Sequence, residues 1–142
     1  MEKHSIKTIW KENNTFETDI DGHKILIDTA VEAGGNDNGP RPKQLMLLAA
    51  SGCTSMDVVS ILKKMRVEFK DFNVSVDAEM TSEHPITYTN AKITYEFEGE
   101  NLTESKNKIE KACALSFDRY CGVIALLKKA IPVTYEVIIK DL

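Results

Sequence analysis

The sequence has no excess of basic residues. Its 142 residues include 18 Lys and Arg against 22 Asp and Glu, which gives a formal net charge of −4. Proteins that bind nucleic acid need clustered Lys and Arg to neutralise phosphates. The short pairs Lys63–Lys64 and Lys128–Lys129 are typical of solvated helix ends instead. The sequence therefore predicts no nucleic-acid partner.

Two kinds of long apolar run are also missing. The first ten residues, MEKHSIKTIW, contain no apolar stretch of signal-peptide length and no small-residue cleavage site. No uninterrupted apolar run reaches the roughly twenty residues that a bilayer core requires. We therefore expect a cytoplasmic protein that has no membrane partner.

Cysteine and histidine are scarce. The three cysteines are Cys53, Cys113 and Cys121, no CxxC motif occurs, and the three histidines are scattered. An odd number of cysteines without a secretion signal argues against a disulfide framework. The ligand spacing argues against a zinc site, so we expect no metal. The cysteines are then either buried structural thiols or redox-active ones.

The length of the chain suits one domain with one proper core, and no linker or internal repeat divides residues 1–142. Hydrophobic periodicity predicts three strands within residues 5–28, a long helix, two strands, a helix, a short helix and a last strand. Such runs of strands and helices without regular βαβ alternation indicate the α+β class.

The predicted long helix, Pro42–Met65, is the centre of the chain. Pro42 suits the first helical turn, where its missing N–H costs nothing. Residues 45–50 are apolar in succession, so the first half of the helix has no polar face and we expect it to be buried. Cys53 lies near the middle of this helix. The sequence therefore predicts that the Cys53 thiol is buried.

Strict alternation of apolar and polar residues marks the two strands that follow, at 72–80 and 91–98. This pattern predicts a sheet that is exposed to solvent on one face and covered by helices on the other. Earlier in the chain, Asp21–Gly22 is a strong hairpin signal because both positions tolerate positive φ. Asn101 is predicted to open the second helix in a capping box with Glu104. The apolar stripe of that helix places Cys113 on its packed face, as a structural thiol.

Cys53 and Cys121 are the two cysteines that could carry chemistry. Cys121 comes at the start of a short helix, where free backbone N–H groups favour an anion and would lower the pKa of the thiol. Burial inside an apolar helix would instead raise the pKa of Cys53 and keep it inert. The residues alone leave both readings open, structural and reactive.

Charged residues near these cysteines bear on the choice. A cation would have to offset the burial of Cys53, and the candidates are Arg41, Lys43 and Arg119. Asp57 lies one helical turn after Cys53 and would disfavour the thiolate unless a base pairs with it. We take these four residues as possible activating or supporting groups.

Two blocks of this sequence resemble the OsmC/Ohr family of thiol-dependent hydroperoxide reductases. They are GPRPKQLMLLAASGCTSMDV, at Gly39–Val58, and LSFDRYCGV, at Leu115–Val123. In that family a proline opens a long central helix with a peroxidatic cysteine at its mid-point, here Cys53. A second cysteine follows a tyrosine after the next helix, here Cys121. The resemblance implies antiparallel sheets around the long helix in an intertwined homodimer, with two active sites at the subunit interface.

The activity implied by the resemblance is the reduction of small organic hydroperoxides in oxidative or osmotic stress. The Cys53 thiolate would attack the peroxide and become a sulfenic acid. Cys121 would condense with it to a disulfide, which an external dithiol reductant would reduce, with no bound cofactor. An apolar wall would favour alkyl or lipid peroxides over hydrogen peroxide. The expected wall residues are Leu45, Met46, Leu48 and Met56.

The chain departs from the family's peroxidase branch at one position. Lys43 stands where that branch has an acidic residue, and no arginine precedes Arg41. The branch's usual Arg–Glu pair therefore cannot be transferred, and the sequence is more similar to the OsmC-like branch. A second hypothesis is a non-catalytic dimer that binds an apolar small molecule in the same pocket. A third, a redox sensor, has no partner surface in the sequence to support it.

Overall fold

The structure is a computed structural model that describes all residues, Met1–Leu142. The chain forms two compact units, Met1–Met46 and Leu47–Leu142, which are described separately here. One domain over residues 1–142 stays a prediction. The helices and strands follow in chain order as β1 (Thr8–Glu12), β2 (Thr15–Ile20), β3 (His23–Ile27), η1 (Val31–Ala33), α1 (Pro42–Lys64), β4 (Asp71–Met80), β5 (Tyr88–Gly99), η2 (Leu102–Ser105), α2 (Lys106–Leu115), η3 (Ser116–Tyr120), α3 (Gly122–Lys128) and β6 (Val133–Asp141).

The first unit contains an antiparallel sheet in the order β1-β2-β3. The turn between β2 and β3 has φ values of 53° at Asp21 and 84° at Gly22. Two successive positive φ values match the twist of a two-residue hairpin, so the hairpin predicted at Asp21–Gly22 is confirmed. Asn13, at φ 48°, makes the turn between β1 and β2.

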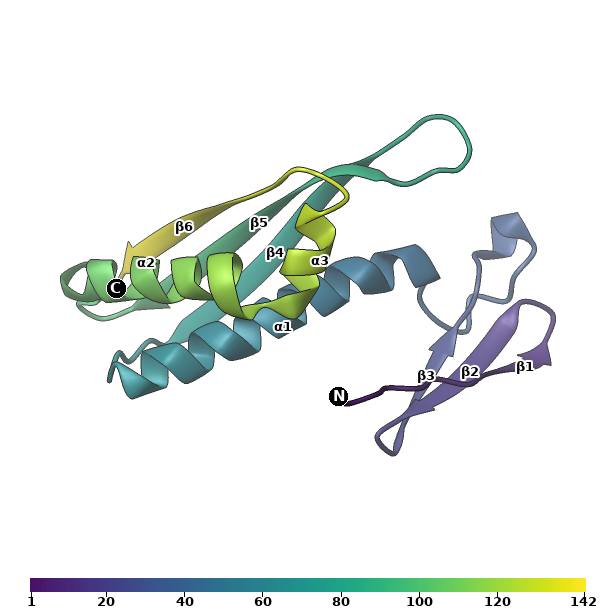
Figure 1. Cartoon of the computed structure of the whole chain (residues 1–142), viewed down its shortest axis with the longest axis horizontal. Helices are drawn as coiled ribbons and strands as arrows, with labels where there is room; N and C mark the ends of the chain where they lie inside the picture. The colour runs from purple at the N-terminus through teal and green to yellow at the C-terminus, as the bar shows by residue number, and fades with distance from the viewer. The chain divides into compact units, whose positions relative to one another are not determined.

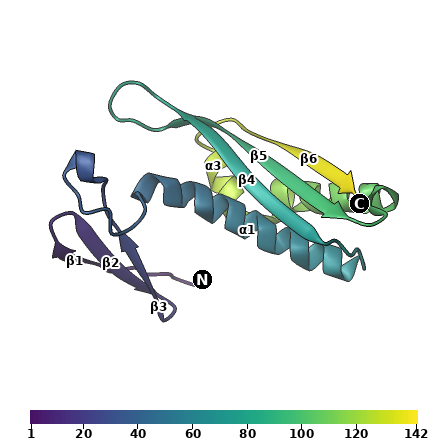
Figure 2. The ribbon, with the colours of Figure 1, turned by 180° about the vertical axis from the view of Figure 1, so that it is seen from behind.

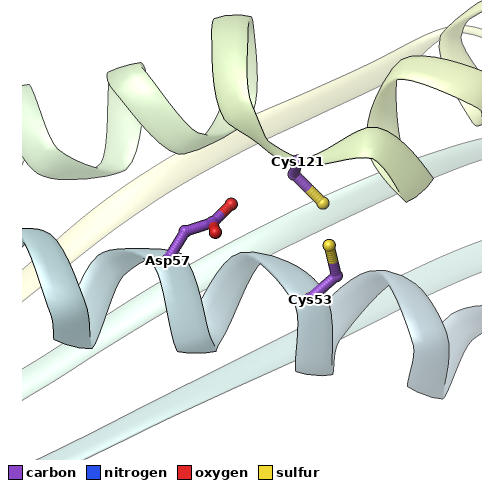
Figure 3. Close-up of side chains that lie close together, drawn as sticks. All are labelled: Cys53, Asp57 and Cys121. Atoms are coloured by element: carbon purple, nitrogen blue, oxygen red, sulfur yellow. The ribbon is translucent and has the colours of Figure 1, made fainter. Parts of the chain in front are cut away.

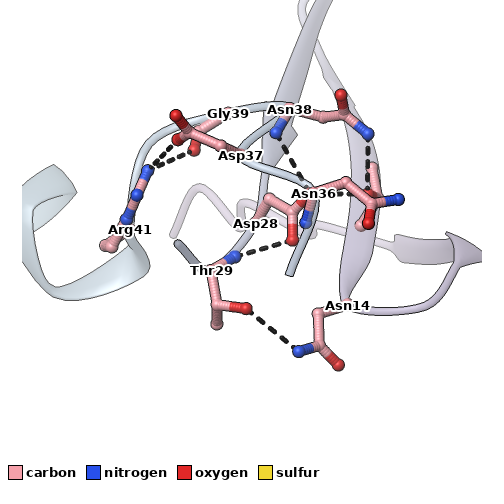
Figure 4. A network of polar contacts seen from close by, with 9 residues as sticks. Asn14, Asp28, Thr29, Asn36, Asp37, Asn38, Gly39 and Arg41 are labelled. Atoms are coloured by element: carbon pink, nitrogen blue, oxygen red, sulfur yellow. Dashed lines mark hydrogen bonds and ion pairs between the residues drawn. The ribbon is translucent and has the colours of Figure 1, made fainter. Parts of the chain in front are cut away.

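A polar network holds the loop that leads from β3 to α1 (Figure 4). Its centre is the buried carboxylate of Asp28, which accepts hydrogen bonds from Thr15 Oγ1 at 2.7 Å and from the backbone N–H of Thr29 at 2.7 Å, Asn36 at 3.3 Å and Asn38 at 3.1 Å. Burial raises the pKa of Asp28, but these four donors outweigh it, so the pKa lies below its usual value. The ionised carboxylate therefore organises the loop.

The second unit contains a sheet in the order β4-β5-β6. Strands β4 and β5 are antiparallel, whereas β6 runs parallel to β5. The sheet is therefore mixed where an antiparallel one was expected, because the helical connection between β5 and β6 is long enough to return the chain to the same end of the sheet. The predicted α+β class is confirmed.

The helices of the second unit cover one face of this sheet (Figures 1 and 2). Alternate residues of β5 point into the core beneath them and are fully or almost fully buried, namely Ala91, Ile93, Tyr95 and Phe97. The opposite face carries ion pairs between Lys92 and Glu136 and between Lys140 and Glu96. The alternation predicted a sheet with one solvent-exposed face, and this prediction is confirmed.

Helix α1 begins at Pro42 as predicted, but only one narrow stripe of it is buried. Ala50, Thr54, Val58 and Leu62, spaced four residues apart, are fully buried. The first half was expected to be buried all round, yet Met46 and Leu48 are 49% and 63% exposed. In the second half, Met56 is 75% exposed. The expectation is wrong, because the core of the second unit packs against only one side of the helix.

By length and composition alone, α1 could cross a membrane. The C-terminal half of its buried stripe belongs to the hydrophobic core. Val58 and Leu62 pack there in one cluster with Ile93 and Phe97 of the sheet. A helix that supplies core side chains to a sheet is a structural element of a folded unit.

The start of the second helix differs from the prediction. Asn101 has φ 55° and makes no capping hydrogen bond, so the expected capping box with Glu104 is wrong. A capping residue typically has extended backbone angles, whereas Asn101 is left-handed, and the chain enters α2 through the short turn η2. The predicted burial of Cys113 is confirmed, whereas Tyr120, seven residues later, is 55% exposed.

Candidate functional site

A widened helical segment sets the position of Cys121. In η3 the backbone N–H of Cys121 donates to the carbonyl of Ser116, five residues earlier, at 2.9 Å. Such i→i+5 segments shift the register of a helix and are frequent at functional sites. The shift turns Tyr120 outward and Cys121 inward, so that Cys121 is only 2% exposed. Its Sγ then accepts a hydrogen bond of 3.4 Å from the N–H of Ile124 at the start of α3.

Three potential ligand or reactive groups meet in the second unit. Cys53 and Asp57 lie one turn apart on α1 and direct their side chains toward Cys121, whose Sγ points back at Cys53 (Figure 3). The two Sγ atoms and a carboxylate oxygen of Asp57 all lie within 4.8 Å of one another. Cys53 and Asp57 are half-buried. We refer to Cys53, Asp57 and Cys121 as the thiol–carboxylate cluster.

A chain of buried hydroxyl groups supports the carboxylate of this cluster. Ser116 Oγ donates to Asp57 Oδ2 at 3.0 Å, and it lies 2.7 Å from Thr54 Oγ1. Thr54 Oγ1 in turn lies 2.6 Å from the hydroxyl of Tyr95. Because an ionised carboxylate only accepts, the proton order that satisfies every group runs from Tyr95 through Thr54 and Ser116 to Asp57. The position of Asp57 is thereby tied to the core of its unit.

Sequence analysis did not identify this hydroxyl chain. Thr54, Tyr95 and Ser116 all lie at positions of a buried stripe or face and are fully buried. A buried hydroxyl needs a partner, so polar residues at packed positions were the available signal. The partners come from three separate elements, and no local pattern connects them.

The pKa of Cys121 differs from the prediction. The pKa of the Cys121 thiol is raised to about 11, chiefly by burial and also by the neighbouring Cys53 thiol, while the N–H groups of Ile124 and Val123 lower it in part. The predicted helix start is present, but its effect is smaller than the cost of burying a charge. The expected lowering is therefore wrong, and Cys121 is a neutral thiol at neutral pH.

Cys113 lies outside the cluster. It is fully buried, and burial, together with Glu110, raises the pKa of its thiol to about 12. A thiol in this environment is inert. Cys113 therefore behaves as the structural residue that was predicted.

The three candidate cations differ in their surroundings. Arg119 is exposed, with its guanidinium carbon 5.9 Å from the centre of the Tyr120 ring, and no hydrogen bond or ion pair joins it to a thiol. Arg41 is bound within the first unit to Asp37 and to the carbonyl of Gly39. Lys43 is half-buried in the first turn of α1. A role for any of them in activating Cys53 stays a prediction.

A surface pocket gives access to the carboxylate. Its lining residues are Asp57, Ser60, Ile61, Lys64, Leu115 and Tyr120. Of the expected apolar wall, Leu48 and Met56 are among the most exposed side chains of α1. The cluster is therefore reachable from solvent on the Asp57 side.

The comparisons with known proteins agree with the blocks that hold the two cysteines. The family model described as OsmC-like protein matches residues 34–136, which include both Cys53 and Cys121. The chain belongs to the OsmC-like family. The resemblance predicted from the sequence is thereby confirmed.

Among curated OsmC-like relatives, protein YhfA of Escherichia coli K12 is 35% identical over 132 residues, which cover 91% of this chain and 94% of YhfA. A solved structure of a hypothetical protein from Aquifex aeolicus VF5 is 26% identical, covers 99% of this chain and 100% of its own, and has a TM-score of 0.79. The organic hydroperoxide resistance protein OsmC of Legionella pneumophila is 16% identical, with 97% and 98% of the two chains covered and a TM-score of 0.66. This last similarity shows the fold alone.

Proposed function

We propose that this OsmC-like protein reduces organic hydroperoxides with Cys53 as the attacking thiol and Cys121 as the resolving thiol. The observation that carries the proposal is the thiol–carboxylate cluster, with both sulfurs and the Asp57 carboxylate within 4.8 Å of one another. A pair of free thiols at this separation, with Cys53 half-buried, Cys121 buried and a carboxylate adjacent to both, suits two-electron thiol oxidation.

The first step oxidises Cys53. Its sulfur attacks the distal oxygen of the hydroperoxide, the O–O bond breaks, and the products are Cys53 sulfenic acid and an alcohol. The thiol proton ends on the alcohol oxygen, so the step is balanced without another reagent. Asp57, held by Ser116, is the group that we propose carries this proton, since it is the carboxylate next to both thiols.

The second step joins the two cysteines. The sulfur of Cys121 displaces the sulfenic oxygen of Cys53, so that a disulfide and one water form. The two Sγ atoms have to close to about 2 Å, which is a short movement from their present separation. An external dithiol then reduces the disulfide and restores both thiols, and the protein needs no bound cofactor.

The environment of the cluster supports an organic rather than an inorganic peroxide. The pocket that Asp57 lines also includes Ile61, Leu115 and Tyr120, whose apolar surface would bind an alkyl chain. The Legionella relative is itself an organic hydroperoxide resistance protein. We place the activity in stress defence in the cytoplasm.

The exposed side of α1 also supports a homodimer. The resemblance to the OsmC/Ohr family implies an intertwined homodimer, and Leu48, Met56 and Val59 are exposed on α1. A row of exposed apolar residues on a helix is unfavourable in water unless something covers it. A second copy of the chain would cover this side of α1.

The test compares three cysteine variants under the same conditions, with consumption of cumene hydroperoxide measured in the presence of a dithiol. Cys53→Ser should lower the rate to that of buffer, because no attacking thiol remains. Cys121→Ser should complete one turnover per chain and then stop, because no disulfide forms for the dithiol to reduce. Cys113→Ala is the matched control and should keep the wild-type rate.

Mass spectrometry after one equivalent of peroxide identifies the product. The expected result is a loss of about two mass units that maps to a Cys53–Cys121 disulfide. Equal peroxide consumption by Cys53→Ser and wild type would overturn the proposal. An unchanged mass, with both thiols free after unfolding, would favour the alternative of a non-catalytic dimer that binds an apolar small molecule.

A further inference from the structure

The thiol–carboxylate cluster has the donor set of a metal site, although the spacing of its residues in the sequence argued against one. We propose that reduced Cys53, Asp57 and Cys121 bind one thiophilic divalent cation per chain, of the Zn²⁺ class, through two sulfurs and one carboxylate oxygen. This proposal does not depend on peroxide reduction, since it requires only that the two thiols are reduced.

The geometry of the cluster is close to that of a zinc site. Zinc binds thiolate sulfur at about 2.3 Å and carboxylate oxygen at about 2.0–2.2 Å, usually in a tetrahedron. Two sulfurs of a tetrahedral site are then about 3.8 Å apart. All three donor atoms already lie within 4.8 Å of one another, so closure needs a movement of about 1 Å or less.

Two of the three donors are already oriented by partners of their own. Ser116 Oγ donates to one carboxylate oxygen of Asp57 at 3.0 Å, which leaves the other oxygen free for a metal. The backbone N–H of Ile124 donates to Cys121 Sγ at 3.4 Å. Metal sites typically hold their ligands through such outer partners. Here Thr54 and Tyr95 extend the support of Asp57 into the core.

The charges in the cluster favour a cation. Asp57 takes part in none of the ion pairs of the chain. A divalent ion would supply the missing positive charge, and it would bind both sulfurs as thiolates, because a coordinating thiol loses its proton. The two protons go to solvent, and no oxidant or reductant is involved.

The identity of the ligands limits the metal. Two sulfurs select Zn²⁺ and similar soft ions over Mg²⁺ and Ca²⁺, which require oxygen ligands. Three protein ligands leave the fourth position to water, on the side of the pocket that Asp57 lines. An open position is typical of catalytic zinc sites rather than closed structural ones. The bound metal and the Cys53–Cys121 disulfide exclude each other, since both use the same two sulfurs.

The test uses the full-length reduced protein without oxygen or peroxide. Co²⁺ is the spectroscopic probe, and one equivalent per chain should produce sulfur-to-cobalt charge transfer with the intense d–d bands of a tetrahedral ion. Zn²⁺ should displace it. Competition with the chromophoric chelator 4-(2-pyridylazo)resorcinol then gives the Zn²⁺ affinity of each variant.

Four variants assign the ligands. Cys53→Ser and Cys121→Ser should each weaken Zn²⁺ binding by about 100-fold or more, and Asp57→Asn by about 10- to 100-fold. Cys113→Ala removes the one thiol outside the cluster and should bind as the wild type does. Circular dichroism checks that each variant is folded.

A measurement on the wild type alone keeps the proposal falsifiable if a variant does not fold. Bound Zn²⁺ should protect Cys53 and Cys121 from iodoacetamide, as mapped by mass spectrometry, and a chelator should remove the protection. Absence of protection, or an octahedral Co²⁺ spectrum without charge transfer, would overturn the site. Unchanged affinity in Asp57→Asn would overturn the three-ligand assignment. If the wild-type protein binds Zn²⁺ but does not reduce peroxide, only the proposed function is overturned.

Discussion

Ser116 links the candidate site to the core of the second unit. Its hydroxyl donates to Asp57 and lies 2.7 Å from Thr54, while the residue itself is fully buried. A buried group that loses its partner keeps the desolvation cost without compensation. Ser116 therefore combines a stability role with a positioning role for Asp57.

Replacement of Ser116 by Ala should lower the free energy of unfolding by about 1–3 kcal/mol, because Asp57 and Thr54 both lose a partner in a buried environment. Urea unfolding followed by far-ultraviolet circular dichroism measures the change. Ser55→Ala is the matched control on α1, where the half-buried hydroxyl donates only to the carbonyl of Ser51.

The Ser55→Ala control should stay within about 0.5 kcal/mol of wild type. Equal losses in the two variants would contradict a special role for Ser116. In the Zn²⁺ titration, Ser116→Ala should lower the affinity by about tenfold, since an outer partner of a ligand is lost.

At the scale of an element, the loop from β3 to α1 depends on one ionised side chain. Asp28 accepts four hydrogen bonds and is buried, it takes part in none of the ion pairs of the chain, and Asp37 and Arg41 of the same loop pair with each other. No cation is required to explain the lowered pKa of Asp28. Backbone and hydroxyl donors are sufficient.

The first unit should therefore become less stable as the pH is lowered. Because the pKa of Asp28 is lower in the folded chain than the ordinary value of an aspartate, the ionised form stabilises the fold. This contribution is complete above the unfolded pKa and is lost as the pH falls through the folded pKa. The fluorescence of Trp10, the one tryptophan, reports unfolding of this unit in urea.

The urea midpoint of wild type should fall as the pH is lowered from about 6 to about 3. Asp28→Asn should have a lower midpoint at about pH 6 and lose most of this dependence. Asp21→Asn, at an exposed turn position of the same unit where asparagine tolerates the positive φ, is the control and should keep the wild-type dependence. An unchanged pH profile in Asp28→Asn would contradict the role of the carboxylate.

At the scale of the whole molecule, the uncovered side of α1 is the main feature that a single chain does not explain. Leu48, Met56 and Val59 are 63%, 75% and 43% exposed on this helix. Burial of apolar surface is worth roughly 25 cal/mol per Å². The homodimer proposed above would remove this surface from water.

Met56→Lys should therefore weaken self-association by about 100-fold, because it places a charge in the proposed interface. Sedimentation velocity across a range of protein concentrations measures the change. Met80→Lys is the matched control, since Met80 is 57% exposed at the end of β4. A wild-type chain that stays monomeric, or identical behaviour of the two variants, would contradict the dimer.

The sequence by itself determined the elements and the family. Periodicity marked α1 and the sheet of the second unit, and Asp21–Gly22 marked a hairpin that the structure contains. The two cysteine-bearing blocks indicated the OsmC-like family. These signals are reliable because they depend on neighbours within a few residues, where propensity and side-chain periodicity act.

Only the tertiary structure decided what surrounds the thiols. Asp57, Ser116 and Cys121 come together from distant parts of the sequence, and the partners of a buried hydroxyl depend on packing between elements. The direction of the pKa shift at Cys121 also reversed, since the N–H groups of a helix start are a local feature but burial is a property of the fold. Distance and desolvation are set by the folded chain as a whole, and for that reason they had to be read from the structure.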